Sequence, residues 1–97
     1  KLALTEDAPT IKPYEESRWA ELADSRLPID PSLTLLAALH ARWGAVLRSM
    51  SEADFARTYV HPEHGRTFTL GGVLGMYAWH GRHHTAHVTS LRSRRGW

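Results

Sequence analysis

Four histidines stand within eight residues near the end of the chain, in the segment 77–87, which reads YAWHGRHHTAH. On a helix, at about 100° per residue, His80, His84 and His87 fall within an arc of about 60°. This arc overlaps an apolar stripe whose members are Val73, Tyr77, Val88 and Leu91. Imidazoles that face a protein interior are costly unless something binds them, and a divalent transition metal commonly does so. The segment therefore favours a metal site in a helical protein. A mixed cluster of core and surface histidines, and an anion or nucleic-acid site, remain the alternatives.

His80 and His84 are four residues apart, which places two imidazole nitrogens where one metal ion can bind both. Gly81 stands where a zincin motif, His-Glu-x-x-His, has its glutamate. The rest of the helix has no carboxylate either, so a base cannot be a glutamate of this helix. The candidates are Glu63 or another histidine, His87. His87 is also a candidate third ligand or a partner that orients a ligand imidazole. His83 is predicted toward the helix edge, either at the surface or as a partner that orients a ligand imidazole.

A second pair of histidines lies in the segment 61–65, HPEHG. Two interpretations remain open for it. His61 and His64 are ordinary turn residues beside a proline and a glycine, or they belong to a loop that folds over the metal pocket and supplies a polar group.

The composition narrows the possible chemistry. The chain has no cysteine, so a metal must be held by His, Asp or Glu. No apolar run is long enough to span a bilayer and no signal peptide opens the chain, so we expect a cytoplasmic protein without membrane contact. Residues 1–30 carry seven acids against four bases, and residues 31–97 carry eight bases against three acids. The basic residues Arg82, Arg92, Arg94 and Arg95 leave nucleic-acid binding as a minor alternative.

Hydrophobic periodicity predicts two long helices. The first spans about 31–50, with Asp30 as its N-cap and Pro31 in its first turn. A short helix from Ser51 to about Arg57 follows, opened by a capping box. Residues 58–70 favour an extended loop or a loose hairpin, and Thr69 can cap a last helix near 70–94.

The N-terminal third predicts a long but ordered connection over 5–30, because prolines and polar residues dominate it. Ile11, Tyr14 and Trp19 are expected to pin this connection to a core. The chain opens on Lys1–Leu4 without an initiating Met, like the last turn of a helix. We therefore expect the chain to be the C-terminal portion of something longer.

Four segments together resemble a known family: 9–14 (PTIKPY), 19–22 (WAEL), 61–67 (HPEHGRT) and 77–87. They are similar to the C-terminal half of the DinB-like superfamily, closest to its YfiT-like metal-dependent hydrolases, the group that contains bacillithiol transferases. The resemblance implies an all-α fold, a DinB-like four-helix bundle in which residues 1–97 form one domain. This chain would supply two long helices, one short helix and the connection.

The resemblance also implies a divalent metal, zinc or nickel, held by three histidines. Two of them map onto His80 and His84, and the third belongs to an N-terminal helix that this chain lacks. Family members are often dimers. Their chemistry implies a metal that activates water or a low-molecular-weight thiol toward a small-molecule electrophile.

Two functions stay open at this point. The first is a metal-dependent hydrolase or thiol S-transferase that uses His80 and His84. The second is a non-catalytic helical module with an incomplete metal site, which associates with itself or a partner. Its contacts would use the apolar residues Leu35, Leu39, Trp43 and Leu74.

Overall fold

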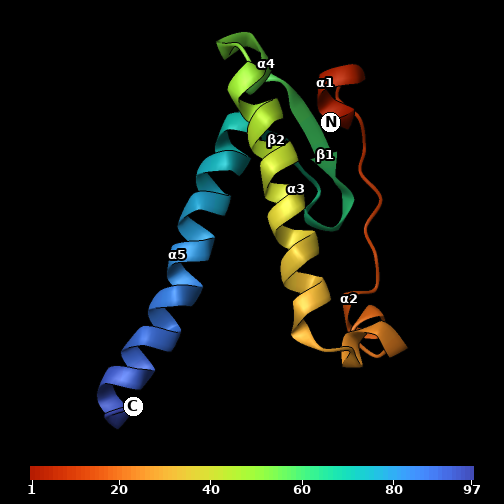
Figure 1. Cartoon of the computed structure of the whole chain (residues 1–97). Helices are drawn as coiled ribbons and strands as arrows, with labels where there is room; N and C mark the ends of the chain where they lie inside the picture. Colours follow the sequence, from red (N-terminus) through yellow and green to blue (C-terminus); the bar gives the residue numbers. More distant parts are fainter.

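A computed structural model describes all 97 residues and shows two long helices that meet at one end and diverge toward the other (Figure 1). These are α3 (Ile29–Ser49) and α5 (Leu70–Arg95). Between them the chain forms the short helix α4 (Glu52–Ala56) and a hairpin of β1 (Thr58–His61) and β2 (Arg66–Thr69). The fold is mostly helical, but because it also contains this two-stranded hairpin, the predicted all-α class describes it only approximately.

The N-terminal region contains only short elements. They are α1 (Leu2–Thr5), α2 (Glu16–Trp19) and the 3-10 turn η1 (Ala23–Arg26). The predicted helical turn at the start of the chain is confirmed by α1. The connection runs alongside the hairpin and then reaches the far end of α3 (Figure 1).

The first long helix is confirmed, but its start differs from the prediction. α3 begins at Ile29 with Pro28 in the N-cap position, and no side chain caps it. Asp30 lies inside the first turn instead of at the cap. Pro31 is tolerated there because backbone N–H groups of a first turn have no helical partner, and the carboxylate of Asp30 still favours the positive end of the helix dipole.

The capping box of the short helix is confirmed in both directions. The Ser51 hydroxyl accepts a hydrogen bond from the Asp54 backbone N–H at 3.2 Å. The backbone N–H of Ser51 donates to the Asp54 carboxylate at 2.9 Å, and the Ser51 hydroxyl donates to the same oxygen at 2.7 Å. These hydrogen bonds stabilise the ionised form and hold the pKa of Asp54 below its ordinary value of 3.8.

The loose hairpin is confirmed as an antiparallel pair that runs from Thr58 opposite Thr69 to His61 opposite Arg66. The 3-10 turn η2 (Pro62–His64) and Gly65, at φ +55°, reverse the chain between the strands. A left-handed φ favours glycine at this position.

The hairpin also fixes the start of α5. The Thr69 hydroxyl accepts from the Gly72 backbone N–H at 3.1 Å, and Leu70 N–H donates to the Arg57 carbonyl at 2.9 Å. The predicted cap and the predicted last helix are thus confirmed. α5 ends at Arg95, and the Gly96 that follows has a left-handed φ of +70°.

The connection is held by its backbone rather than by its aromatic side chains. Ile11 N–H donates to the Val60 carbonyl at 3.0 Å, and Val60 N–H donates to the Pro9 carbonyl at 2.9 Å. Tyr14 and Trp19 are 54% and 61% exposed and contact each other, with ring centroids 4.7 Å apart. The prediction that they pin the connection to a core is therefore wrong for these two, whereas Ile11 is half-buried.

Arg57 ties the N-terminus to the hairpin. Its Nε donates to the Ala3 carbonyl, and one terminal guanidinium nitrogen donates to the Glu6 carbonyl at 2.8 Å. A planar guanidinium suits such a double contact.

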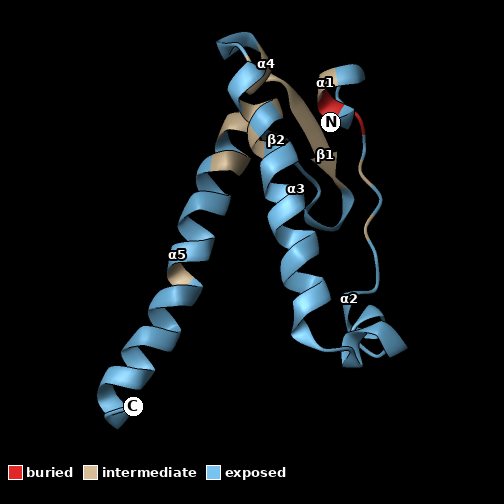
Figure 2. Cartoon of the chain, in the orientation of Figure 1, coloured by how far each residue is buried: buried red, intermediate tan, exposed pale blue.

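The long helices bury very little. Only Ala3 and Pro9 are buried in the whole chain. Leu35 and Leu39 on α3 are 70% and 55% exposed, and Figure 2 shows both long helices as largely exposed. Exposed apolar side chains that share one helix face indicate an interaction surface. We therefore expect another element to cover this face of α3. No helix here combines the length and apolar character that crossing a bilayer requires.

Replacing Asp54 by Asn tests the capping box. Because the folded-state pKa of Asp54 is depressed, its carboxylate stabilises the fold above pH 3.8, and this contribution is lost as the pH falls through the folded-state pKa. We expect Asp54→Asn to lower the urea midpoint at pH 7 and to match the unsubstituted chain much more closely near pH 3. An equal difference at both pH values would contradict this assignment.

Replacing Gly81 by Ala tests whether α5 is packed by anything at that point. A Cβ built on Gly81 or Gly75 meets no atom within 4 Å, whereas one on Gly72 lies 3.0 Å from the Thr69 hydroxyl oxygen. Since glycine costs a helix interior about 0.5–1 kcal/mol relative to alanine, Gly81→Ala and Gly75→Ala should each raise the unfolding free energy by that amount. Gly72→Ala should not. A loss of stability at Gly81 would instead mean that a further element packs there.

Candidate metal centre

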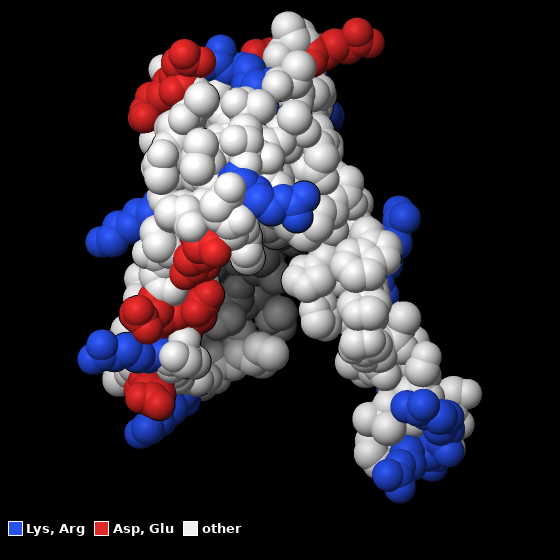
Figure 3. All heavy atoms as spheres, turned by 180° about the vertical axis from the view of Figure 1, so that it is seen from behind, with Lys and Arg blue, Asp and Glu red and all other residues white.

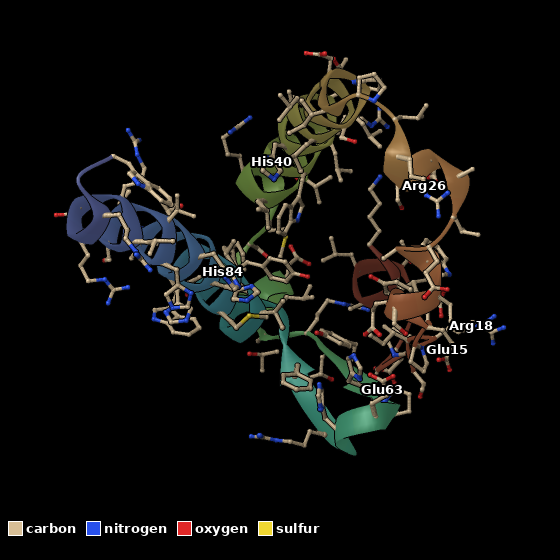
Figure 4. The ribbon with its side chains drawn as sticks, turned by 90° about the horizontal axis from the view of Figure 1, so that it is seen from below. Glu15, Arg18, Arg26, His40, Glu63 and His84 are labelled. Carbon is tan, nitrogen blue, oxygen red and sulfur yellow. The ribbon has the colours of Figure 1, made fainter.

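His80 and His84 come together on α5, one helical turn apart. Their Nε2 atoms lie 2.8 Å apart, and their ring centroids are 4.4 Å apart with planes at 68°. Figure 4 places His84 on the side of α5 toward the space between α5 and α3, with His40 on α3 across that space. The histidine pair therefore presents two nitrogens to a single point.

The nitrogen spacing fits two ligands of one metal ion. Two nitrogens bound tetrahedrally to one zinc ion at about 2.05 Å lie about 3.3 Å apart. A small rotation of either ring opens the observed 2.8 Å to that value. Without a metal, the same contact is a hydrogen bond in which one Nε2–H donates to the other nitrogen.

The histidines are less buried than the sequence predicted. His80, His84 and His87 are exposed in this chain, whereas His83 is half-buried. The prediction of three interior imidazoles and a surface His83 is thus wrong for the chain as it stands. The physical reason is that nothing within these 97 residues covers the face of α5 that carries His80 and His84.

His83 lies between an indole and a second imidazole. Its ring stacks on Trp79 at 4.7 Å and 18°, and meets the edge of the His87 ring at 4.2 Å. Burial lowers the pKa of His83 below 6.5, and the neighbouring His87, His84 and His80 lower it further because they disfavour another positive charge. The four histidines thus form two i, i+4 pairs.

No third ligand joins the pair within this chain. The structure contains no group of three or more His, Asp or Glu side chains arranged to hold a metal ion. The His87 ring centroid is 5.7 Å from that of His84 and lies closer to His83. Glu63 is on the turn of the hairpin, well apart from His84 in Figure 4. The structure therefore does not bring Glu63 or His87 into one site with His80 and His84.

Aromatic contacts join α5 to α3 one helical turn before the histidine pair. Tyr77, one turn before His80, meets the Trp43 ring edge-on at 5.5 Å, and Trp43 also lies 6.3 Å from the His40 ring. Edge-to-face contacts of this kind stabilise packing between helices. They link α3 to α5 on the side where the pair lies.

The hairpin carries a cluster that the sequence prediction only partly identified. His61 and His64 lie 4.5 Å apart, and Tyr59 stacks on Phe68 at 5.7 Å. The Nδ1 atom of His61 is buried without a hydrogen-bond partner. Burial, with the nearby Tyr77 phenol, raises the pKa of Tyr59 above its ordinary value. The alternation of Tyr59 and His61 along one strand was the available signal, since such residues share a face.

Charge is distributed unevenly over the surface. Figure 3 shows Lys and Arg gathered at the free end of α5, and the basic residues of its last turn are Arg92, Arg94 and Arg95. Cations at that position favour the negative end of the helix dipole. This accounts for the basic tail without a nucleic-acid ligand.

Comparison with known proteins gives a consistent result. A protein of Bacillus mycoides named "Putative metal-dependent hydrolase" is 59% identical over all 97 residues, which cover 56% of its length. A Bacillus anthracis protein of the same name is 58% identical with the same coverage. The chain thus spans about half the length of the curated relatives it matches.

A solved structure agrees with these relatives. YfiT from Bacillus subtilis, described as "a probable metal-dependent hydrolase with an unusual four-helix bundle topology", superposes with a TM-score of 0.87 at 46% identity. The match covers 99% of this chain and 55% of YfiT. The DinB superfamily profile matches residues 2–88. The chain therefore belongs to the DinB superfamily.

Proposed function

We propose that this chain supplies two of the metal ligands, His80 and His84, of a metal-dependent hydrolase or thiol S-transferase. The observation that carries the proposal is the 2.8 Å separation of their Nε2 atoms on one face of α5. The names of the relatives and of YfiT support the reaction class. Zinc and nickel both suit imidazole ligands.

When bound, a divalent metal acts as a Lewis acid that makes water or a thiol more acidic. The chain's own residues would hold the metal and orient its ligands. His80 and His84 direct two ring nitrogens to one point, and α5 keeps them in register because they are one helical turn apart. Tyr77, one turn before His80, contacts Trp43 of α3 edge-on. Such surroundings favour a small molecule with an apolar part as substrate.

A complete metal site requires a donor from outside these residues. The chain covers 56% of its relatives, and the exposed apolar face of α3 calls for a covering element. Further bundle helices, or a second copy of the chain, can provide both the cover and a third ligand. Association through the apolar face of α3 is thus required for the metal function and is not an alternative to it.

Replacing His84 by Ala tests the ligand assignment. The chain, in the assembly that it forms, should retain about one zinc or nickel ion per site after dialysis. His84→Ala should weaken metal affinity by more than about tenfold, since removing a direct ligand costs at least as much as removing an outer partner. The matched control is His87→Ala, which should retain the metal.

Metal content that stays the same in His84→Ala, or that falls only in His87→Ala, would contradict the assignment. Far-ultraviolet circular dichroism of each variant separates loss of a ligand from loss of the helix.

Replacing Leu39 by Gln tests whether the face of α3 is covered. We expect light scattering to show self-association of the chain, because burying an exposed leucine contributes about 1.5–3 kcal/mol. Leu39→Gln should shift the equilibrium toward monomer. A chain that stays monomeric at high concentration would contradict self-association.

A further inference from the structure

A cavity of about 700 Å³ lies between the connection, the hairpin and the first turns of α5. This volume is within the range of about 300–1,000 Å³ that small-molecule sites occupy. Its α5 wall is formed by Val73, Met76 and Tyr77. His80 follows Tyr77 by three residues, about 4.5 Å along the helix axis and on the same face. His80 and His84 do not line the cavity, which contacts α5 only up to Tyr77.

The walls of the cavity suit an aromatic or apolar body. Tyr59 and Phe68 stack on each other at 5.7 Å and 23°, and both line the cavity with Tyr77. The raised pKa of Tyr59 keeps its hydroxyl protonated, so the phenols add no negative charge. A flat apolar group can lie against these rings.

The charged groups that line the cavity are negative on balance. They are the carboxylates of Glu16 and Glu63 and the ammonium group of Lys12. The aromatic faces also attract cations, as shown by Arg66, whose guanidinium lies 5.9 Å from the Phe68 ring centroid. Together these groups favour a positively charged ligand.

We propose that this cavity binds a primary amine carried on an aromatic or apolar body. The ammonium group would lie near Glu63, and the body would lie against Tyr59, Phe68 and Tyr77. The inference does not depend on the proposed function, because His80 and His84 are not among the residues that line the cavity.

His61 supplies an independent sign of a ligand. Its ring lines the cavity, but its Nδ1 is buried without a partner, which destabilises the fold. A ligand N–H that reached this nitrogen would supply the missing partner. A polar atom that costs stability and gains a partner only on binding is typical of a binding residue.

The probe is benzylamine, compared with benzyl alcohol and benzoate in NMR titrations of the EDTA-treated chain at low salt. Benzylamine should bind at least about fivefold more tightly than benzoate, a difference of about 1 kcal/mol. Glu63→Gln should weaken benzylamine binding. Its matched control is Glu52→Gln on α4, outside the cavity, which should leave the affinity unchanged.

His61→Phe keeps a ring of similar size and removes both nitrogens. We expect it to weaken benzylamine binding and yet to raise the urea midpoint, because the unpartnered nitrogen is gone. A purely structural His61 would lower the midpoint instead. The control His40→Phe lies on α3, outside the cavity, and should leave the affinity unchanged.

Three results would overturn the inference: benzoate that binds as tightly as benzylamine, an affinity unchanged in Glu63→Gln, or amine binding that requires added metal and His84. The last result would place the amine on the metal rather than in the cavity. Benzylamine binding in a chain that never retains zinc or nickel would instead support the cavity and overturn only the metal proposal.

Discussion

The uncovered apolar face of α3 is the constraint on which the rest of the structure depends. A folded domain is stabilised mainly by apolar burial, and its net stability is only about 5–15 kcal/mol. With only Ala3 and Pro9 buried, the chain lacks the core that would hold α3 and α5 together along their length. Contacts at one end, including Trp43 against Tyr77, set the angle between the helices. Whatever covers α3 therefore also determines what faces the histidine pair.

The small elements at the joined end do more than connect the long helices. Arg57 ties the N-terminal turn to the hairpin, and its carbonyl accepts from the first residue of α5. Thr69 caps the same helix. The hairpin thereby fixes where α5 begins, and a rigid helix carries that position four turns or less to His80 and His84. The candidate metal ligands His80 and His84 and the cavity are therefore both positioned by the hairpin.

Local signals in the sequence predicted the elements well. The capping box at Ser51 and the cap at Thr69 depend on residues three apart, so they can be read without the rest of the fold. The start of α3 was missed at Asp30, because Pro28 and Ile29 extend the first turn in a way that cap preferences do not distinguish. The prediction that Tyr14 and Trp19 pin the connection to a core was wrong, because this chain provides no core on which these aromatic side chains could pack.

The candidate site was predictable only in part for a related reason. The i, i+4 spacing of His80 and His84 determines their convergence, since both are on one helix. Burial of the histidines was overestimated because no element of this chain covers that face of α5. The cavity requires a hairpin, a connection and a helix that are distant in sequence, so helix spacing alone could not reveal it. Tyr59 and Phe68 became visible as a pair only from the strand register.

X-ray absorption at the zinc or nickel edge tests the central claim most directly, because it counts the imidazoles bound to the metal. The account predicts a metal with imidazole ligands in the chain as it assembles, and one imidazole fewer when His84 is replaced by Ala. An unchanged imidazole count in that variant, or a metal bound only by oxygen, would contradict the convergence of His80 and His84 on one ion.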